Sequence, residues 1–125
     1  MALIEKFEDI RGWQEARLLT RQIYGLTRTG LLSKDFGLRD QIQRASVSVM
    51  ANIAEGFDCD SHREFARFLG IARRSAVEVQ SLLYICLDVA YISHVQFDTS
   101  YQQATKTKKM IHALKQSLEK RANST

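Results

Sequence analysis

The sequence predicts an all-α fold: a single domain over residues 1–125, built as an antiparallel up-down-up-down four-helix bundle. Apolar residues recur at intervals of three and four along four long segments. The chain contains no proline, a residue that breaks helix interiors. Only short connections separate the four segments, so neighbouring helices should run antiparallel. With 125 residues, 45% of them hydrophobic, the chain is long enough to bury a core.

The first two helices are predicted over residues 10–29 and 35–55. Asp9 is placed to cap the start of the first, and Gly30 follows its end. The second should stop at Gly56. The apolar residues expected to face inward are Trp13, Ala16, Leu19, Ile23, Leu26, Leu38, Ile42, Ala45, Val49 and Ile53.

The third and fourth helices are predicted over residues 61–91 and 94–120. Ser61 and Glu64 form a capping box at the start of the third helix, and Ser93 and Gln96 form a weaker one before the fourth. A later start of the fourth helix, at Asp98, stays open as an alternative. The residues expected to face inward are Phe65, Phe68, Ala72, Ala76, Val79, Leu83, Cys86, Ala90, Phe97, Tyr101, Ala104, Ile111, Leu114 and Leu118.

A polar stripe lies near the end of the second helix. Ser48, Asn52 and Glu55 are spaced i, i+4, i+7 and therefore share one helix face, just before Gly56. The stripe could face solvent, or it could form a satisfied contact between helices. We favour a structural lock, in which Glu55 reaches Arg63 or Arg67 and Asn52 bonds the backbone of the third helix or Ser75.

The third helix is more apolar than a surface helix of a monomer requires. Apolar residues lie off its bundle-facing side as well as on it. Either the helix is packed between two neighbours, or a second face is buried against another subunit, which makes the protein a homo-oligomer. The residues predicted for such an interface are Val77, Leu82, Ile85 and Val89.

Basic residues line faces of three predicted helices, and the net charge is +4. They could serve solubility alone, or they could contact nucleic-acid phosphates without reading sequence. Tyr24 lies within the arginine stripe of the first helix, which favours the second interpretation. The residues predicted to bind RNA or DNA are Arg17, Arg21, Arg28, Arg63, Arg67, Arg74, Lys106, Lys108, Lys109 and Lys115.

Patterns typical of enzymes and metal proteins are missing from the sequence. Cys59 and His62 are three residues apart, but structural zinc requires four suitably spaced ligands. The six glycines are scattered and form no phosphate-binding loop. We therefore expect no catalytic residues, no metal, no cofactor and no small-molecule substrate.

The sequence also predicts a cytoplasmic protein that does not enter a membrane. The most apolar stretch, residues 76–92, contains Glu78 and Asp88. The first residues lack the basic start and long apolar core of a signal peptide. The two distant cysteines are expected to be free thiols.

Several motifs resemble those of a bacterial four-helix-bundle family. It includes proteins encoded in intervening sequences of large-subunit ribosomal RNA genes, and the accessory variability protein of diversity-generating retroelements. The matching segments are Trp13-Gln14-Glu15-Ala16, Phe36-Gly37-Leu38, Gln41-Ile42-Gln43-Arg44-Ala45, Asn52-Ile53-Ala54-Glu55-Gly56 and Arg73-Arg74-Ser75-Ala76-Val77-Glu78. One position and one segment depart from the family pattern. Met50 stands where many members have proline, and the segment after Gly56 is acidic where it is usually basic.

The resemblance implies a homopentamer without enzymatic activity. The retroelement members bind nucleic acid through basic surfaces and partner a reverse transcriptase, whereas the ribosomal-intervening-sequence members have no settled function. The retroelement members are more basic than this chain, which favours the ribosomal-intervening-sequence role. The alternative is a protein-interaction adaptor, such as one that binds a reverse transcriptase.

Overall fold

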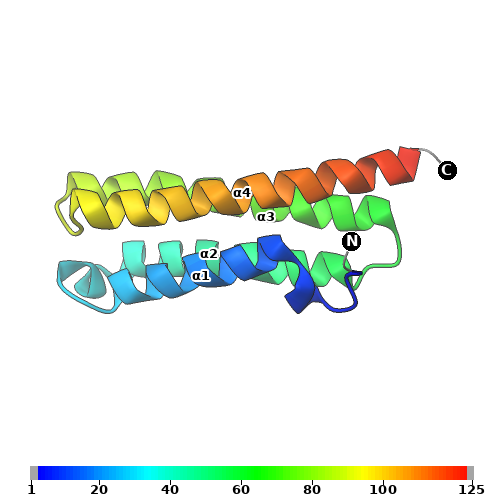
Figure 1. Ribbon diagram of the computed structural model, residues 1–125. Helices are drawn as coiled ribbons and strands as arrows, with labels where there is room; N and C mark the ends of the chain where they lie inside the picture. Colours follow the sequence, from blue (N-terminus) through cyan, green and yellow to red (C-terminus); the bar gives the residue numbers. More distant parts are fainter. Residues whose placement is uncertain (1–2, 124–125) are drawn as a thin grey trace.

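The computed structural model describes residues 3–123 and consists of four helices (Figure 1). They are α1 (Arg11–Thr27), α2 (Phe36–Phe57), α3 (His62–Asp88) and α4 (His94–Asn123), with short 3-10 helices η1 (Phe7–Asp9) and η2 (Leu31–Lys34). Each helix packs against the next in sequence, and α4 packs back against α1. The predicted all-α, up-down-up-down bundle is therefore confirmed. In this arrangement α1 lies diagonally across the bundle from α3.

The core consists of two apolar clusters, and each draws on all four helices. One lies toward the α3–α4 turn and includes Ile23, Ile42 and Leu83. The other lies toward the α2–α3 turn and includes Ile53 and Leu69. These five side chains are at most 1% exposed. Fully burying such a side chain contributes about 1.5–3 kcal/mol, so the two clusters are the main stabilising element of the bundle.

Local capping sets the starts of three helices. The Ser61 Oγ accepts a hydrogen bond from the Glu64 backbone N–H at 3.1 Å. The Ser93–Gln96 box is reciprocal, with bonds of 3.1 and 2.9 Å, so α4 starts at His94 and not at Asp98. Asp35 caps α2 by accepting from the Leu38 N–H at 3.3 Å.

The start of α1 differs from the prediction. Its N-cap residue is Ile10, which makes no side-chain capping bond. Asp9 accepts instead from the backbone N–H groups of Glu5 and Lys6, because it belongs to the preceding η1 turn.

The helix ends also differ from the predicted ones. α1 ends at Thr27, and Gly30, with φ 62° and ψ −156°, precedes η2. α3 ends at Asp88 because the chain reverses through Ala90, whose φ is 61°. There the Tyr91 N–H bonds the Cys86 carbonyl at 2.9 Å and the Ala90 N–H bonds the Leu87 carbonyl at 3.0 Å. This is a Schellman motif with alanine where glycine is usual. α4 continues past the predicted residue 120 to Asn123.

Gly56 is not the helix stop that we predicted. It lies inside α2, is buried, and is followed by Phe57 before the helix ends. A Cβ atom at this position would lie 2.7 Å from the Phe68 Cβ and 2.9 Å from the Phe65 Cδ1. Glycine is required here because α2 and α3 approach closely, not because the backbone turns.

Candidate nucleic-acid interface

The polar stripe of α2 joins this helix to α3 through Ser48. The Ser48 and Ser75 Oγ atoms are 2.9 Å apart, and the Asn52 Nδ2 donates to the Ser48 carbonyl at 2.8 Å and to its Oγ at 3.0 Å. Asn52 therefore supports the link from within α2, and the predicted bond from Asn52 to α3 is wrong. Glu55 is exposed and reaches neither Arg63 nor Arg67. Ser48 and Asn52 therefore have structural roles, whereas the predicted role of Glu55 is wrong.

The arginines of α1 form the most open basic face. Arg17, Arg21 and Arg28 are all exposed on the outer side of the helix. Within residues 3–123, none of the three has a carboxylate partner. The Arg17 guanidinium lies 5.9 Å from the centroid of the Trp13 ring, and the Arg28 Nε donates to the Tyr24 carbonyl at 3.2 Å. Their charges therefore remain available to an anionic partner.

Two hollows adjoin this α1 face. One, of about 410 Å³, is lined by residues of η1 and α1 that include Trp13, Arg17 and Arg21. The other, of about 590 Å³, lies between Tyr24 of α1 and the α2 residues around Arg44. Arg44 is exposed and was not among the predicted binding residues. Its position opposite Tyr24 depends on how α1 packs against α2, which the sequence does not reveal.

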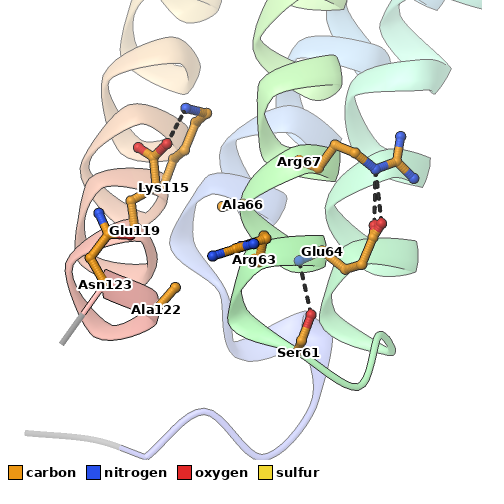
Figure 2. Close-up of a pocket in the computed structure, with 9 residues that line it drawn as sticks. All are labelled: Ser61, Arg63, Glu64, Ala66, Arg67, Lys115, Glu119, Ala122 and Asn123. Atoms are coloured by element: carbon orange, nitrogen blue, oxygen red, sulfur yellow. Dashed lines mark hydrogen bonds and ion pairs between the residues drawn. The ribbon is translucent and has the colours of Figure 1, made fainter. Parts of the chain in front are cut away.

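On α3, the predicted basic residues do not form one surface. Figure 2 shows Arg63 directed toward α4 and Arg67 directed away from it. The Arg67 Nε binds both carboxylate oxygens of Glu64 at 2.9 Å, so this charge is neutralised locally. Arg63 lines a hollow of about 450 Å³ between α3 and α4 together with Lys115. Arg74 is exposed farther along the helix.

Most of the predicted basic residues on α4 already have partners in the chain. Lys106 lies 3.5 Å from the Glu15 carboxylate, and Lys115 lies 3.0 Å from Glu119. Lys108 is half-buried and donates to the Gln80 Oε1 at 2.9 Å, so it packs between α3 and α4. The prediction that Lys108 faces a nucleic acid is therefore wrong. Lys109 alone of the four is exposed without a partner in the part of the chain that the structure describes. Helix α4 is thus a weaker phosphate-binding face than α1.

Exposed apolar side chains lie among the exposed polar residues Glu78, Ser81 and Asp88 over the second half of α3. Val77, Ile85 and Val89 are 47%, 46% and 50% exposed, as expected of residues available to a second subunit. Leu82 was wrongly assigned to this face: it is 5% exposed and belongs to the core between α3 and its neighbours. Tyr84, which is 49% exposed, adds apolar surface that the sequence analysis missed.

Cys86 is a buried free thiol in the core of the bundle. Burial raises the pKa of the Cys86 thiol to about 11, so the thiol stays protonated at neutral pH. Over residues 3–123, no three His, Cys, Asp or Glu side chains gather closely enough to hold a metal ion. No helix in the same range is both long and apolar enough to cross a membrane.

Comparison with known proteins gives a family and a fold. The model of the family described as 23S rRNA-intervening sequence protein matches residues 8–113. A similar solved structure is a protein with unknown function from the S23 ribosomal protein family of Bacteroides thetaiotaomicron VPI-5482, determined at 1.70 Å resolution. The match has 23% sequence identity and a TM-score of 0.78, and covers 84% of this chain and 95% of the other. This likeness shows a shared fold. Among curated proteins, none matches the chain significantly.

Proposed function

The chain belongs to the 23S rRNA-intervening sequence protein family, and on that basis we propose that it is a non-enzymatic, homo-oligomeric helical bundle that associates with RNA or DNA. One observation carries the nucleic-acid part of this proposal. Arg17, Arg21 and Arg28 line one exposed helix face and have no carboxylate partner within residues 3–123. Arg44 adds a fourth exposed guanidinium on the neighbouring helix.

Such a face suits the phosphate backbone better than base edges. Arginine binds phosphate oxygens through paired N–H donors, and the counterions released on binding make the affinity depend on salt. The four helices of the described chain do not include a helix-turn-helix motif, which would place a recognition helix in the major groove. We therefore expect weak, sequence-tolerant binding, strengthened when several subunits present the same face.

Fluorescence anisotropy at rising salt tests this assignment. The variant R17Q, R21Q, R28Q should bind labelled RNA or DNA more weakly, and its log–log salt slope should fall by about 0.7–0.9 for each lost phosphate contact. The matched control is K106Q, K109Q, K120Q, which removes the same charge from α4 and should have a smaller effect. Equal losses in both variants would contradict an α1 site, and no binding at low salt would refute the nucleic-acid role.

The exposed apolar face of α3 supports the oligomeric part of the proposal. Val77, Ile85 and Val89 lie on the outer side of α3, diagonally across the bundle from α1. A second subunit could cover this face and leave the α1 arginines exposed. Multi-angle light scattering should give a multiple of the 14.3 kDa chain mass, and a pentamer would give five times that mass. A 14.3 kDa species at micromolar concentration would rule out the oligomer.

The same α3 face favours a second candidate, a protein-interaction adaptor. In this case the apolar surface would receive another protein, such as the reverse transcriptase of a diversity-generating retroelement, instead of a second copy of the chain. The two candidates differ in an affinity-capture experiment. An adaptor should retain one stoichiometric protein partner after nuclease treatment, whereas the nucleic-acid-associated bundle should lose its co-purifying material.

A further inference from the structure

The basic face of α1 continues into a hollow that phosphate binding alone does not explain. The hollow of about 590 Å³ is mainly apolar and is lined by Tyr24, Asp40, Gln43, Arg44, Val47 and Ser48. Phosphates need exposed cations, and Arg44 is the cation among these lining residues. A concave apolar surface instead fits a flat group that carries polar atoms at its edge.

The walls of the hollow suit a nucleobase. Tyr24 of α1 is half-buried, and Val47 of α2 is 43% exposed. An aromatic ring and a branched aliphatic side chain therefore line the hollow from two neighbouring helices. Base–aromatic contacts are a common source of affinity for single strands, because every base has an apolar face.

Polar atoms of fixed position also line the hollow. The Gln43 Nε2 donates to the Thr27 Oγ1 at 2.9 Å, and Thr27 in turn donates to the Tyr24 carbonyl at 3.3 Å. The Gln43 amide is therefore held by α1, and its carbonyl oxygen remains an acceptor. The Asp40 carboxylate binds the Arg39 Nε through Oδ1 at 2.9 Å, which leaves its second oxygen as another acceptor. Acceptors of this kind can bind the N–H groups of a base edge.

We propose that this hollow holds an unstacked base of a single-stranded nucleic acid, while Arg44 and Arg21 bind the phosphates beside it. The inference rests on the proposed nucleic-acid function and specifies its ligand. A paired, stacked base cannot leave its duplex without a cost, so the site discriminates against duplexes. The base would be held by stacking and by a few hydrogen-bond acceptors. The site should therefore distinguish one base from another less strongly than it distinguishes a single strand from a duplex.

Three labelled probes of about 12 nucleotides separate base binding from phosphate binding. They are a mixed-sequence single-stranded RNA, the same RNA as a duplex, and an abasic ribose-phosphate strand of equal length and charge. The full chain should bind the single strand about tenfold more tightly than the abasic strand, which reflects the typical contribution of one stacked base. It should also prefer the single strand to the duplex.

Substitutions in the hollow test whether it causes the preference for the single strand over the abasic strand. Tyr24→Leu should remove the preference for the single strand over the abasic strand and leave abasic binding unchanged, whereas Tyr24→Phe should retain it. Val47→Gln, at an exposed position, fills the hollow with a neutral polar chain and should reduce the same ratio. It serves as the second variant if Tyr24→Leu melts early by circular dichroism.

The outcomes distinguish this inference from the function on which it rests. Equal binding of the single strand and the abasic strand would overturn the base site and leave phosphate binding intact. A preference unaffected by Tyr24→Leu and Val47→Gln would place the base elsewhere and also overturn it. Absence of binding to all three probes would refute the proposed function itself.

Discussion

The Ser48 and Ser75 hydroxyl oxygens lie 2.9 Å apart and link α2 to α3, and Asn52 donates to the same Ser48 oxygen at 3.0 Å. Ser48 is thus the centre of a small polar network between two helices. Ser75 is 9% exposed, so loss of its partner leaves a hydroxyl with little access to water. A buried polar group without a partner costs about 1–3 kcal/mol.

Ser48→Ala should therefore lower the free energy of unfolding by about 1–2 kcal/mol, measured by urea denaturation. Asn52→Ala should cost less, because it leaves the Ser48–Ser75 bond in place. The control is Gln102→Ala on the exposed side of α4, which should change stability by less than about 0.5 kcal/mol. A Ser48→Ala protein as stable as Gln102→Ala would show that the network contributes nothing.

Gly56 and Gly25 make opposite predictions for the same substitution. A Cβ atom at Gly56 would lie 2.7 Å from the Phe68 Cβ, whereas one at Gly25 would meet nothing within 4 Å. Gly56→Ala should destabilise the protein by about 1–3 kcal/mol through overpacking, despite the better helix propensity of alanine. Gly25→Ala should stabilise it by up to about 1 kcal/mol. Thermal melts of both variants give the comparison, and a stabilised Gly56→Ala would contradict the close approach of α2 and α3.

These contacts show which parts of the structure the sequence could predict. Two helix starts were predictable because capping is local: Ser61 and Ser93 lie three residues before the groups with which they pair. The role of Gly56 was not, because a glycine that ends a helix and one that admits a neighbouring helix look alike in sequence. Ala90 gave no signal for the end of α3, since it is not the glycine that such a turn usually has.

The candidate site was predicted in part for the same reason. The arginines of α1 were found from their spacing within one helix. The partner of Lys106 was not, because Glu15 is distant in sequence and meets it only when α4 packs against α1. The hollow between Tyr24 and Arg44 likewise exists only in the folded bundle.

Ala90 predicts a stabilising substitution. Its φ of 61° places an alanine in the left-handed region, which costs an L-residue about 1–2 kcal/mol. Glycine adopts this conformation without the steric cost, although it loses more chain entropy on folding. Ala90→Gly should therefore raise the unfolding free energy by about 0.5–1 kcal/mol. Ala113→Gly, on the exposed side of α4, should instead lower it by about 1 kcal/mol. Equal destabilisation by both would contradict the Schellman motif.

Tyr91 predicts a loss of stability at alkaline pH. Its hydroxyl donates to the Asp35 Oδ2 at 3.1 Å, and this hydrogen bond, followed by burial, raises the pKa of Tyr91 above its ordinary value of 10.0. The unfolded chain therefore ionises at lower pH than the folded one. The contribution of the bond is complete below the unfolded pKa and is lost as the pH rises through the folded pKa.

Thermal melts of Tyr91→Phe at neutral and alkaline pH test this. The variant should be less stable than the natural chain at neutral pH, and the difference should shrink above about pH 10. Tyr24→Phe is the control, because the Tyr24 hydroxyl makes no hydrogen bond within residues 3–123, and it should leave stability unchanged at neutral pH. A constant difference between Tyr91→Phe and the natural chain at all pH values would contradict the assignment.

Ile85 tests whether the outer face of α3 is the subunit interface. It is 46% exposed and lies one turn before Val89 on the same face. An aspartate there is tolerated in a monomer but would bury a carboxylate in an oligomer, which is strongly unfavourable without a partner. Ile85→Asp should reduce the mass by light scattering to about 14.3 kDa while the helical circular dichroism is kept.

Leu18→Asp is the matched control for this experiment. Leu18 is 38% exposed on α1, which lies diagonally across the bundle from α3. It should leave the mass unchanged. If Ile85→Asp also kept the mass of the assembly, the interface would lie on another surface. The α3 face would then be available to a different protein, as the adaptor function requires.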